Sequence, residues 1–217
     1  MFVRNRMTPN PVTTTPNTTI YDALELMRKN NVRRLPVVEK GQLIGIVTES
    51  ELLRVSPSPA TSLSVFELNY ILSKMQVKDV MTRDVVTVTP DTTIEEAAVL
   101  MRDNVVSGLP VLENGKLVGI ITETNIFDAF VDLMGLRKAG VRLTLEMEDR
   151  TGMMATLTQI IKEHGVNIIS IATFLSEGQN PCIVMRLDTT NPQPVVEDIK
   201  AAGYKIYDVT VMNNKEH

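Results

Sequence analysis

The chain has 217 residues, of which 43% are hydrophobic, and this is enough for one large domain or two small ones with buried cores. A net charge of −4 and a pI near 5.3 argue against nucleic acid as a partner, because affinity for its backbone needs a basic face. No window approaches the ~18 apolar residues of a membrane span, the N-terminus lacks the apolar core of a secretory signal, and the single Cys182 fits a reducing compartment. We therefore expect a cytoplasmic protein without a membrane partner.

One stretch of the chain is repeated. Residues Met7–Glu49 and Met81–Glu123 align without a gap at an offset of 74 residues, and 25 of the 43 aligned pairs are identical. Two copies are too few for a solenoid. Two like units that bury a shared face form a pseudo-twofold pair with clefts along its axis, and we expect the function in those clefts.

Each copy predicts the order β-α-β-β-α: a short strand, an amphipathic helix with a capping-box-like start, a strand that contains proline and is therefore an edge or a bulge, an apolar strand, and a second helix. In the first copy these elements are Pro11–Thr15, a helix after Thr19 with the apolar stripe Ile20, Ala23, Leu24 and Met27, Leu35–Val38, Leu43–Val47, and a helix from Thr48. In the second copy they are Val85–Thr89, a helix after Thr93, Leu109–Leu112, Leu117–Ile121, and a helix from Thr122.

Between the copies, a breaker-rich loop precedes a helix that Ser64-x-x-Glu67 caps. This helix is either a connector packed against the pair, or a dimerisation helix or gate. After the second copy a helix at Ile126–Arg137 leads to a new pattern, which predicts a split β-α-β-β-α-β unit of the ferredoxin-like kind. Its expected elements are Val141–Met147, Met153–His164, Ile168–Leu175, a turn at 177–181, Cys182–Leu187, Pro194–Ala202 and Ile206–Met212.

The predicted class is α+β, with four segments along the chain. They are the first repeat at 1–55, a linker and helix at 56–76, the second repeat at 77–135, and the C-terminal unit at 140–213.

The doubled unit resembles the CBS domain, named for cystathionine β-synthase, which works in pairs called Bateman modules. The resemblance rests on Met7-Thr8 and Met81-Thr82, on Arg34–Val38, and on Gly45–Glu51 with Gly119–Asn125. The C-terminal unit resembles the ACT domain, a sensor that often binds amino acids, through 149–152 and Gly165–Ile168, although Thr151 stands where proline is usual. The combination resembles the acetoin utilisation protein B-like family.

The CBS resemblance implies an adenine ligand: AMP, ADP, ATP or S-adenosylmethionine. The threonine that opens the second helix would meet phosphate, the residue three positions later would accept ribose hydroxyls, and the residues before the Leu-Pro-Val strand would meet phosphates. One cleft would then combine Thr48, Glu51, Ser107 and Gly108, and the other Thr122, Asn125, Arg33 and Arg34. We expect unequal clefts, with the phosphorylated ligand at the arginines. In the alternative, the arginines are solvated surface charges and the threonines only cap helices.

The ACT resemblance implies an amino-acid site at Asp149, Gly152 and Met153, where a helix N-terminus attracts a carboxylate, with Asn167 on the same ligand or across a dimer interface. The alternative is a purely structural role in capping and turning. The histidines, His164 and His217, have no metal-ligand spacing, and no catalytic motif is present, so we expect neither a metal nor a catalytic site.

Three functions remain in competition. The leading hypothesis is a non-catalytic regulatory sensor, a homodimer whose geometry responds to an adenine nucleotide, and to an amino acid at the ACT unit, and so alters an unidentified metabolic enzyme or regulator. The second is a dimerisation and interaction protein without a ligand, which regulates an enzyme of acetoin or central carbon metabolism by family analogy. The third is a nucleotide hydrolase with a carboxylate in the cleft.

Overall fold

The computed structural model describes residues 1–55, 64, 67, 70, 74–148, 150–175 and 181–213. Most of the predicted connector helix after Ser64, Asp149 and most of the predicted turn at 177–181 lie outside these residues. The predicted cap of the connector helix is confirmed, because the N–H and hydroxyl of Ser64 donate to Oε2 of Glu67 at 2.8 and 2.7 Å. The chain divides into two compact units, Met1–Phe127 and Asp128–His217, which are described separately below.

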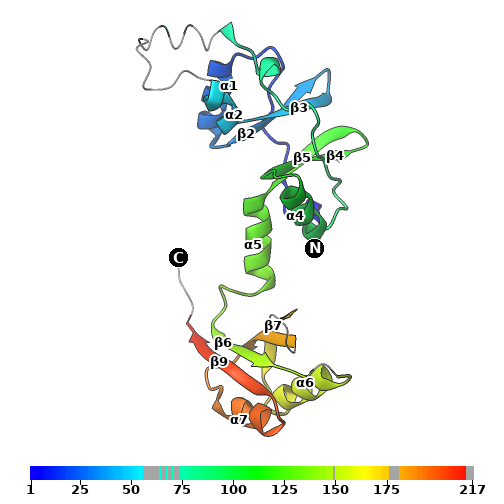
Figure 1. Cartoon of the computed structure of the whole chain (residues 1–217), viewed down its shortest axis with the longest axis vertical. Helices are drawn as coiled ribbons and strands as arrows, with labels where there is room; N and C mark the ends of the chain where they lie inside the picture. Colours follow the sequence, from blue (N-terminus) through cyan, green and yellow to red (C-terminus); the bar gives the residue numbers. More distant parts are fainter. Residues whose placement is uncertain are drawn as a thin grey trace. The chain divides into compact units, whose positions relative to one another are not determined.

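The first unit contains the first repeat and the second repeat as far as Phe127, within its last helix. Each repeat has two helices and an antiparallel hairpin (Figure 1). In the first repeat these elements are α1 (Ile20–Asn30), β2 (Arg34–Glu39), β3 (Gln42–Thr48) and α2 (Glu49–Val55). In the second they are α4 (Ile94–Asp103), β4 (Gly108–Glu113), β5 (Lys116–Thr122) and α5 (Glu123–Leu133). The caps are as predicted, because the Thr19 and Thr93 side chains accept hydrogen bonds from the backbone N–H groups of Asp22 and Glu96.

The predicted short strands at Pro11–Thr15 and Val85–Thr89 are wrong as regular strands. Each makes a single parallel bridge, between Thr14 and Val37 and between Val88 and Val111. The contact ends where β2 and β4 shift register, after Val37 and Val111, next to their prolines. The predicted irregularity of the proline-containing strands is confirmed by these register shifts. Because a proline has no N–H to donate, it also prevents the ladder with the preceding segment from continuing.

The N-terminal segment of each repeat crosses to the other repeat. Strand β1 (Thr8–Pro9) pairs with β5 of the second repeat, and the equivalent Thr82 bridges Ile46 in β3 of the first. The short 3₁₀ helices Val3–Asn5 and Val77–Asp79 start with matching hydrogen bonds, from the N–H of Val3 to Thr92 and from the N–H of Val77 to Thr18. This exchange ties the two repeats together.

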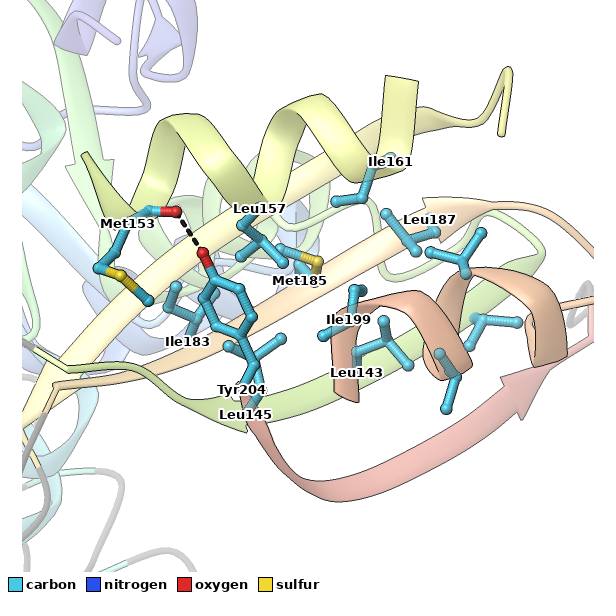
Figure 2. Packing of buried hydrophobic residues seen from close by; sticks show 13 residues of the cluster. Leu143, Leu145, Met153, Leu157, Ile161, Ile183, Met185, Leu187, Ile199 and Tyr204 are labelled. Atoms are coloured by element: carbon cyan, nitrogen blue, oxygen red, sulfur yellow. Dashed lines mark hydrogen bonds between the residues drawn. The ribbon is translucent and has the colours of Figure 1, made fainter. Parts of the chain in front are cut away.

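The second unit has the predicted ferredoxin-like order. Its elements are β6 (Gly140–Glu146), α6 (Met153–Glu163), β7 (Asn167–Leu175), β8 (Pro181–Asp188), α7 (Gln193–Ala201) and β9 (Lys205–Met212). The sheet is antiparallel throughout, with strand order β7-β8-β6-β9. Alternate side chains of β6 and β8 face the two helices and form the core in Figure 2, where Tyr204 donates a 2.6 Å hydrogen bond to the backbone oxygen of Met153. This bond satisfies a buried carbonyl at the start of α6.

Candidate functional site

The candidate site in the first unit is built on the junctions where an apolar strand turns into a helix. At the β3–α2 junction, the N–H and hydroxyl of Thr48 both donate to Oε2 of Glu51, at 2.7 Å each. At the β5–α5 junction, the same groups of Thr122 donate to Oδ1 of Asn125, at 2.9 and 2.8 Å. The two junctions therefore have the same local geometry, and each threonine caps its own helix.

Glu51 and Asn125, the residues three positions after the threonines, differ in their further hydrogen bonds. The second carboxylate oxygen of Glu51 accepts a 2.9 Å hydrogen bond from the hydroxyl of Thr82, at the start of the second repeat. Asn125 has only one accepting oxygen, which Thr122 already occupies. The ribose contacts expected of Glu51 and Asn125 stay predictions, and in Glu51 both accepting oxygens already have a partner.

An arginine crosses the pseudo-twofold axis. The guanidinium of Arg34 donates to the backbone oxygen of Ser107 through Nη1, and to its hydroxyl through Nη2 at 2.9 Å. Burial lowers the pKa of the Arg34 guanidinium from its ordinary value, and the nearby Glu123 carboxylate opposes that shift. An arginine stays charged in proteins even so, which means that a cation is held at the axis.

Gly108 leaves the space that Arg34 fills. The offset of 74 residues makes Gly108 the equivalent of Arg34, and Ser107 the equivalent of Arg33. A Cβ atom at position 108 would overlap Nη1 of Arg34 and lie 3.0 Å from its Cζ and 3.1 Å from its Cδ. A side chain at position 108 would therefore displace Arg34 from its present position, and the two repeats are unequal where they meet.

We expect Gly108→Ala to lower the free energy of unfolding by about 1–2 kcal/mol, because the new methyl group displaces Arg34 from its charge-assisted hydrogen bonds to Ser107. Urea unfolding of the two single variants and the double variant with Arg34→Ala forms the cycle that measures this coupling. In the Arg34→Ala background the same alanine should cost almost nothing. An equal cost in both backgrounds would show that Gly108 serves the backbone and not Arg34.

Two clefts in this unit bring predicted residues together. The axial cleft, of about 280 Å³, is lined by equivalent residues of both repeats, and we name it for that reason. Its lining consists of Arg33, Arg34, Thr48, Glu49, Ser50, Ser107, Thr122, Glu123 and Thr124. The arginine cleft, of about 610 Å³, contains the predicted combination of Arg33, Arg34 and Thr122, while Asn125 is not part of its lining.

Several residues of these clefts were missed by the sequence interpretation. The arginine cleft has further lining from Thr8, Asn10, Pro11, Val12, Asn30, Asn31, Val32, Ile120 and Thr124. Asn10 and Asn31 adopt positive φ, of 47° and 51°, and asparagine is one of the few residues that tolerates this conformation. An asparagine after a helix or before a proline was a usable signal for these turns, whereas the apolar residues carried none.

In the second unit the predicted amino-acid residues lie at opposite ends of helix α6. Gly152 is its N-cap, with φ of 92°, and Met153 is its first residue. Asn167 begins β7 beyond the other end and lines a hollow of about 390 Å³ with Thr158 and Lys162. Since 11 helical residues span ~16 Å, one chain does not bring these residues together.

Two observations on the described part of the chain concern metal ions and membranes. Within it, no group of three or more His, Cys, Asp or Glu side chains is arranged to hold a metal ion. None of its helices has both the length and the apolar character needed to cross a membrane.

The comparison with protein families now identifies the fold. The CBS domain model matches residues 3–58 and 77–132, which together exceed half of the chain, so the protein belongs to the CBS-domain family. The TTHA0829-like ACT domain model matches residues 139–210. The protein is thus a tandem CBS pair followed by an ACT domain, and both modules are regulatory.

Curated relatives match the CBS region. The uncharacterized protein MJ1426 of Methanocaldococcus jannaschii is 33% identical over 155 residues, which cover 60% of this chain and 92% of the relative. The CBS domain-containing protein YhcV of Bacillus subtilis is 30% identical over 142 residues, with 65% and 92% covered. An inosine-5′-monophosphate dehydrogenase of Korarchaeum cryptofilum matches over only 33% of its own length, so the match does not extend that enzyme's activity to this chain.

Solved structures match the same region. CBSX2 in complex with AMP is 34% identical with a TM-score of 0.50, covering 60% of this chain and 96% of that one. The CBS pair of protein MJ0100, solved with 5′-methylthioadenosine and S-adenosyl-L-methionine, is 26% identical with a TM-score of 0.51, covering 64% and 98%. A protein from Vibrio cholerae assigned to acetoin utilization (AcuB) is 29% identical with a TM-score of 0.51, covering 63% and 94%.

Proposed function

We propose that this protein is a regulatory sensor that binds an adenine nucleotide in the arginine cleft. The observation that carries the proposal is the guanidinium of Arg33, which is exposed and makes no hydrogen bond or ion pair within the described residues. It lines the same cleft as Arg34 and Thr122, whose side chains already have partners. Arg33 is therefore the cation that is available to a phosphate.

The rest of the cleft suits a nucleoside. Pro11, Val12, Val32 and Ile120 give it an apolar part, and the threonines and asparagines give it hydroxyl and amide groups. Small-molecule sites typically combine an apolar lining with a few polar groups that fix orientation. Complexes of the similar CBS proteins CBSX2 with AMP and MJ0100 with S-adenosylmethionine and 5′-methylthioadenosine support an adenine ligand.

The test is a thermal-shift panel of the purified chain with AMP, ADP, ATP, S-adenosylmethionine and NAD. A ligand at 100 times its dissociation constant stabilises the fold by about 2.7 kcal/mol, which a melting curve resolves. We expect a selective rise in the melting temperature with at least one adenine ligand. A flat panel would remove the sensor proposal and favour the interaction protein described next.

An interaction protein without a small ligand is the second candidate, and exposed apolar side chains favour it. Helix α5 exposes Phe127 at 68%, Phe130 at 53% and Leu133 at 50%. Leu53, the equivalent of Phe127 in the first repeat, is 51% exposed. Phe127, Phe130 and Leu133 are three residues apart on one helix and so lie near one another. A contiguous apolar patch is typical of a protein–protein interface, which a homodimer or a regulated enzyme would cover.

In either case we propose a non-catalytic role. The homodimer, the metabolic partner, the cytoplasmic location and an amino acid at Gly152, Met153 and Asn167 stay predictions. Two copies of the chain would have to supply the two ends of α6 for that amino-acid site, because one copy separates them.

A further inference from the structure

The axial cleft continues from the phosphate end of the arginine cleft. The two clefts share four lining residues: Arg33, Arg34, Thr122 and Thr124. A phosphate held by Arg33 would lie at this shared boundary. Any additional phosphate of the same nucleotide would then extend toward the axis, so the side chains of the axial cleft decide how long a phosphate chain the site accepts.

Two carboxylates line the cleft into which an additional phosphate would extend. Glu49 and Glu123 are equivalent residues of the two repeats, and both line the axial cleft. They are also the first residues of α2 and α5. A helix start normally attracts anions, but here each start carries its own negative side chain, which compensates the positive end of the helix dipole.

The axial cleft contains two arginines, but neither is available to an additional phosphate. Arg34 is already bound to Ser107. Burial lowers the pKa of Arg34, and the Glu123 carboxylate lies near enough to oppose that shift. Arg33 remains for the first phosphate. With two arginines and two glutamates in the lining, a second or third phosphate would bring negative charge into a cleft with no spare cation.

We propose that Glu49 and Glu123 restrict the site to nucleoside monophosphates by repelling the additional phosphates of ADP and ATP. This inference rests on the proposed nucleotide site and names the ligand class within it. Specificity of this kind comes from an unfavourable interaction with the competitor, and not only from contacts to the preferred ligand.

Isothermal titration calorimetry with AMP and ATP, in EDTA and again with magnesium, tests the inference. In the wild type we expect AMP to bind at least about tenfold more tightly than ATP, a difference of about 1.4 kcal/mol. In the double variant Glu49→Gln/Glu123→Gln the ratio of ATP to AMP affinity should rise about tenfold. The control Glu113→Gln, at the far end of β4, should leave this ratio unchanged.

Equal or tighter binding of ATP by the wild type, with or without magnesium, would overturn the inference while leaving the nucleotide sensor in place. An unchanged ratio in the double variant would do the same. Lack of binding by AMP and ATP alike would instead remove the nucleotide site itself, and the inference with it. Melting curves of each variant, recorded without ligand, separate an effect on binding from a loss of fold.

Discussion

Replacing Arg33 with alanine is expected to weaken AMP binding between tenfold and a hundredfold. Hydrogen bonds to a charged group contribute about 1.5–3 kcal/mol, and Arg33 is the guanidinium in the arginine cleft that has no hydrogen-bond partner within the described residues. Its removal leaves Arg34, which is held by Ser107, and the hydroxyl of Thr122, which is held by Asn125. Titration of both proteins at one salt concentration measures the difference, since salt screens an exposed cation.

The matched control for this experiment is Arg102→Ala. Arg102 is an exposed arginine in the last turn of α4 and is not part of either cleft. It has the same charge, so any general electrostatic attraction of the nucleotide to the protein is lost equally in both variants. Equal losses in the two variants would assign no specific role to Arg33, and the arginines would then be solvated surface charges.

Replacing Leu157 with alanine is expected to destabilise the second unit by about 2–5 kcal/mol, because it removes a fully buried side chain from the core and leaves a cavity. Leu157 projects from α6 into the core beside Tyr204 in Figure 2. We expect AMP affinity to persist, since the arginine cleft belongs to the first unit. Urea unfolding followed by circular dichroism measures the stability, and calorimetry measures the affinity.

The comparison protein is Gln159→Ala, an exposed position on the same helix, for which a change within about 0.5 kcal/mol is expected. If Leu157→Ala lowered the stability of both units equally, they would unfold as one cooperative structure, and the assumption of separate transitions would be wrong. Loss of AMP binding at temperatures where the first unit is folded would show that the second unit supports the site.

Patterns within a segment of a few residues predicted most of the fold. The stripe of Ile20, Ala23, Leu24 and Met27 is buried in α1 as its spacing indicated, and the alternation in 141–147 produced β6. The segment Pro11–Thr15 was misassigned because a strand needs a partner over several residues, and a run of threonines does not reveal how far the partner continues. The length of the contact depends on the register of β2, which is set by its pairing with β3 and not by the threonine segment.

The candidate site was predictable in its composition and less so in its chemistry. The resemblance to paired CBS domains implied that Arg33, Arg34 and Thr122 share a cleft, and the structure places all three in one cleft. It could not distinguish the two arginines, because the difference depends on Ser107, 73 residues away from Arg34. Nor did it assign a role to Glu49 and Glu123, which look like ordinary acidic residues at helix starts.

The contact between Arg34 and Gly108 also bears on why the two repeats share one chain. A symmetric dimer of single repeats would present the same residue from both partners at every equivalent position on its axis. Two arginines would then repel each other at this point, and two glycines would leave it without a cation. To place an arginine opposite a glycine, the two repeats must differ in sequence. Each repeat must also pair only with the other kind, and never with a copy of itself. Fusion of the repeats satisfies both conditions, and it allows a twofold scaffold to carry a directional site.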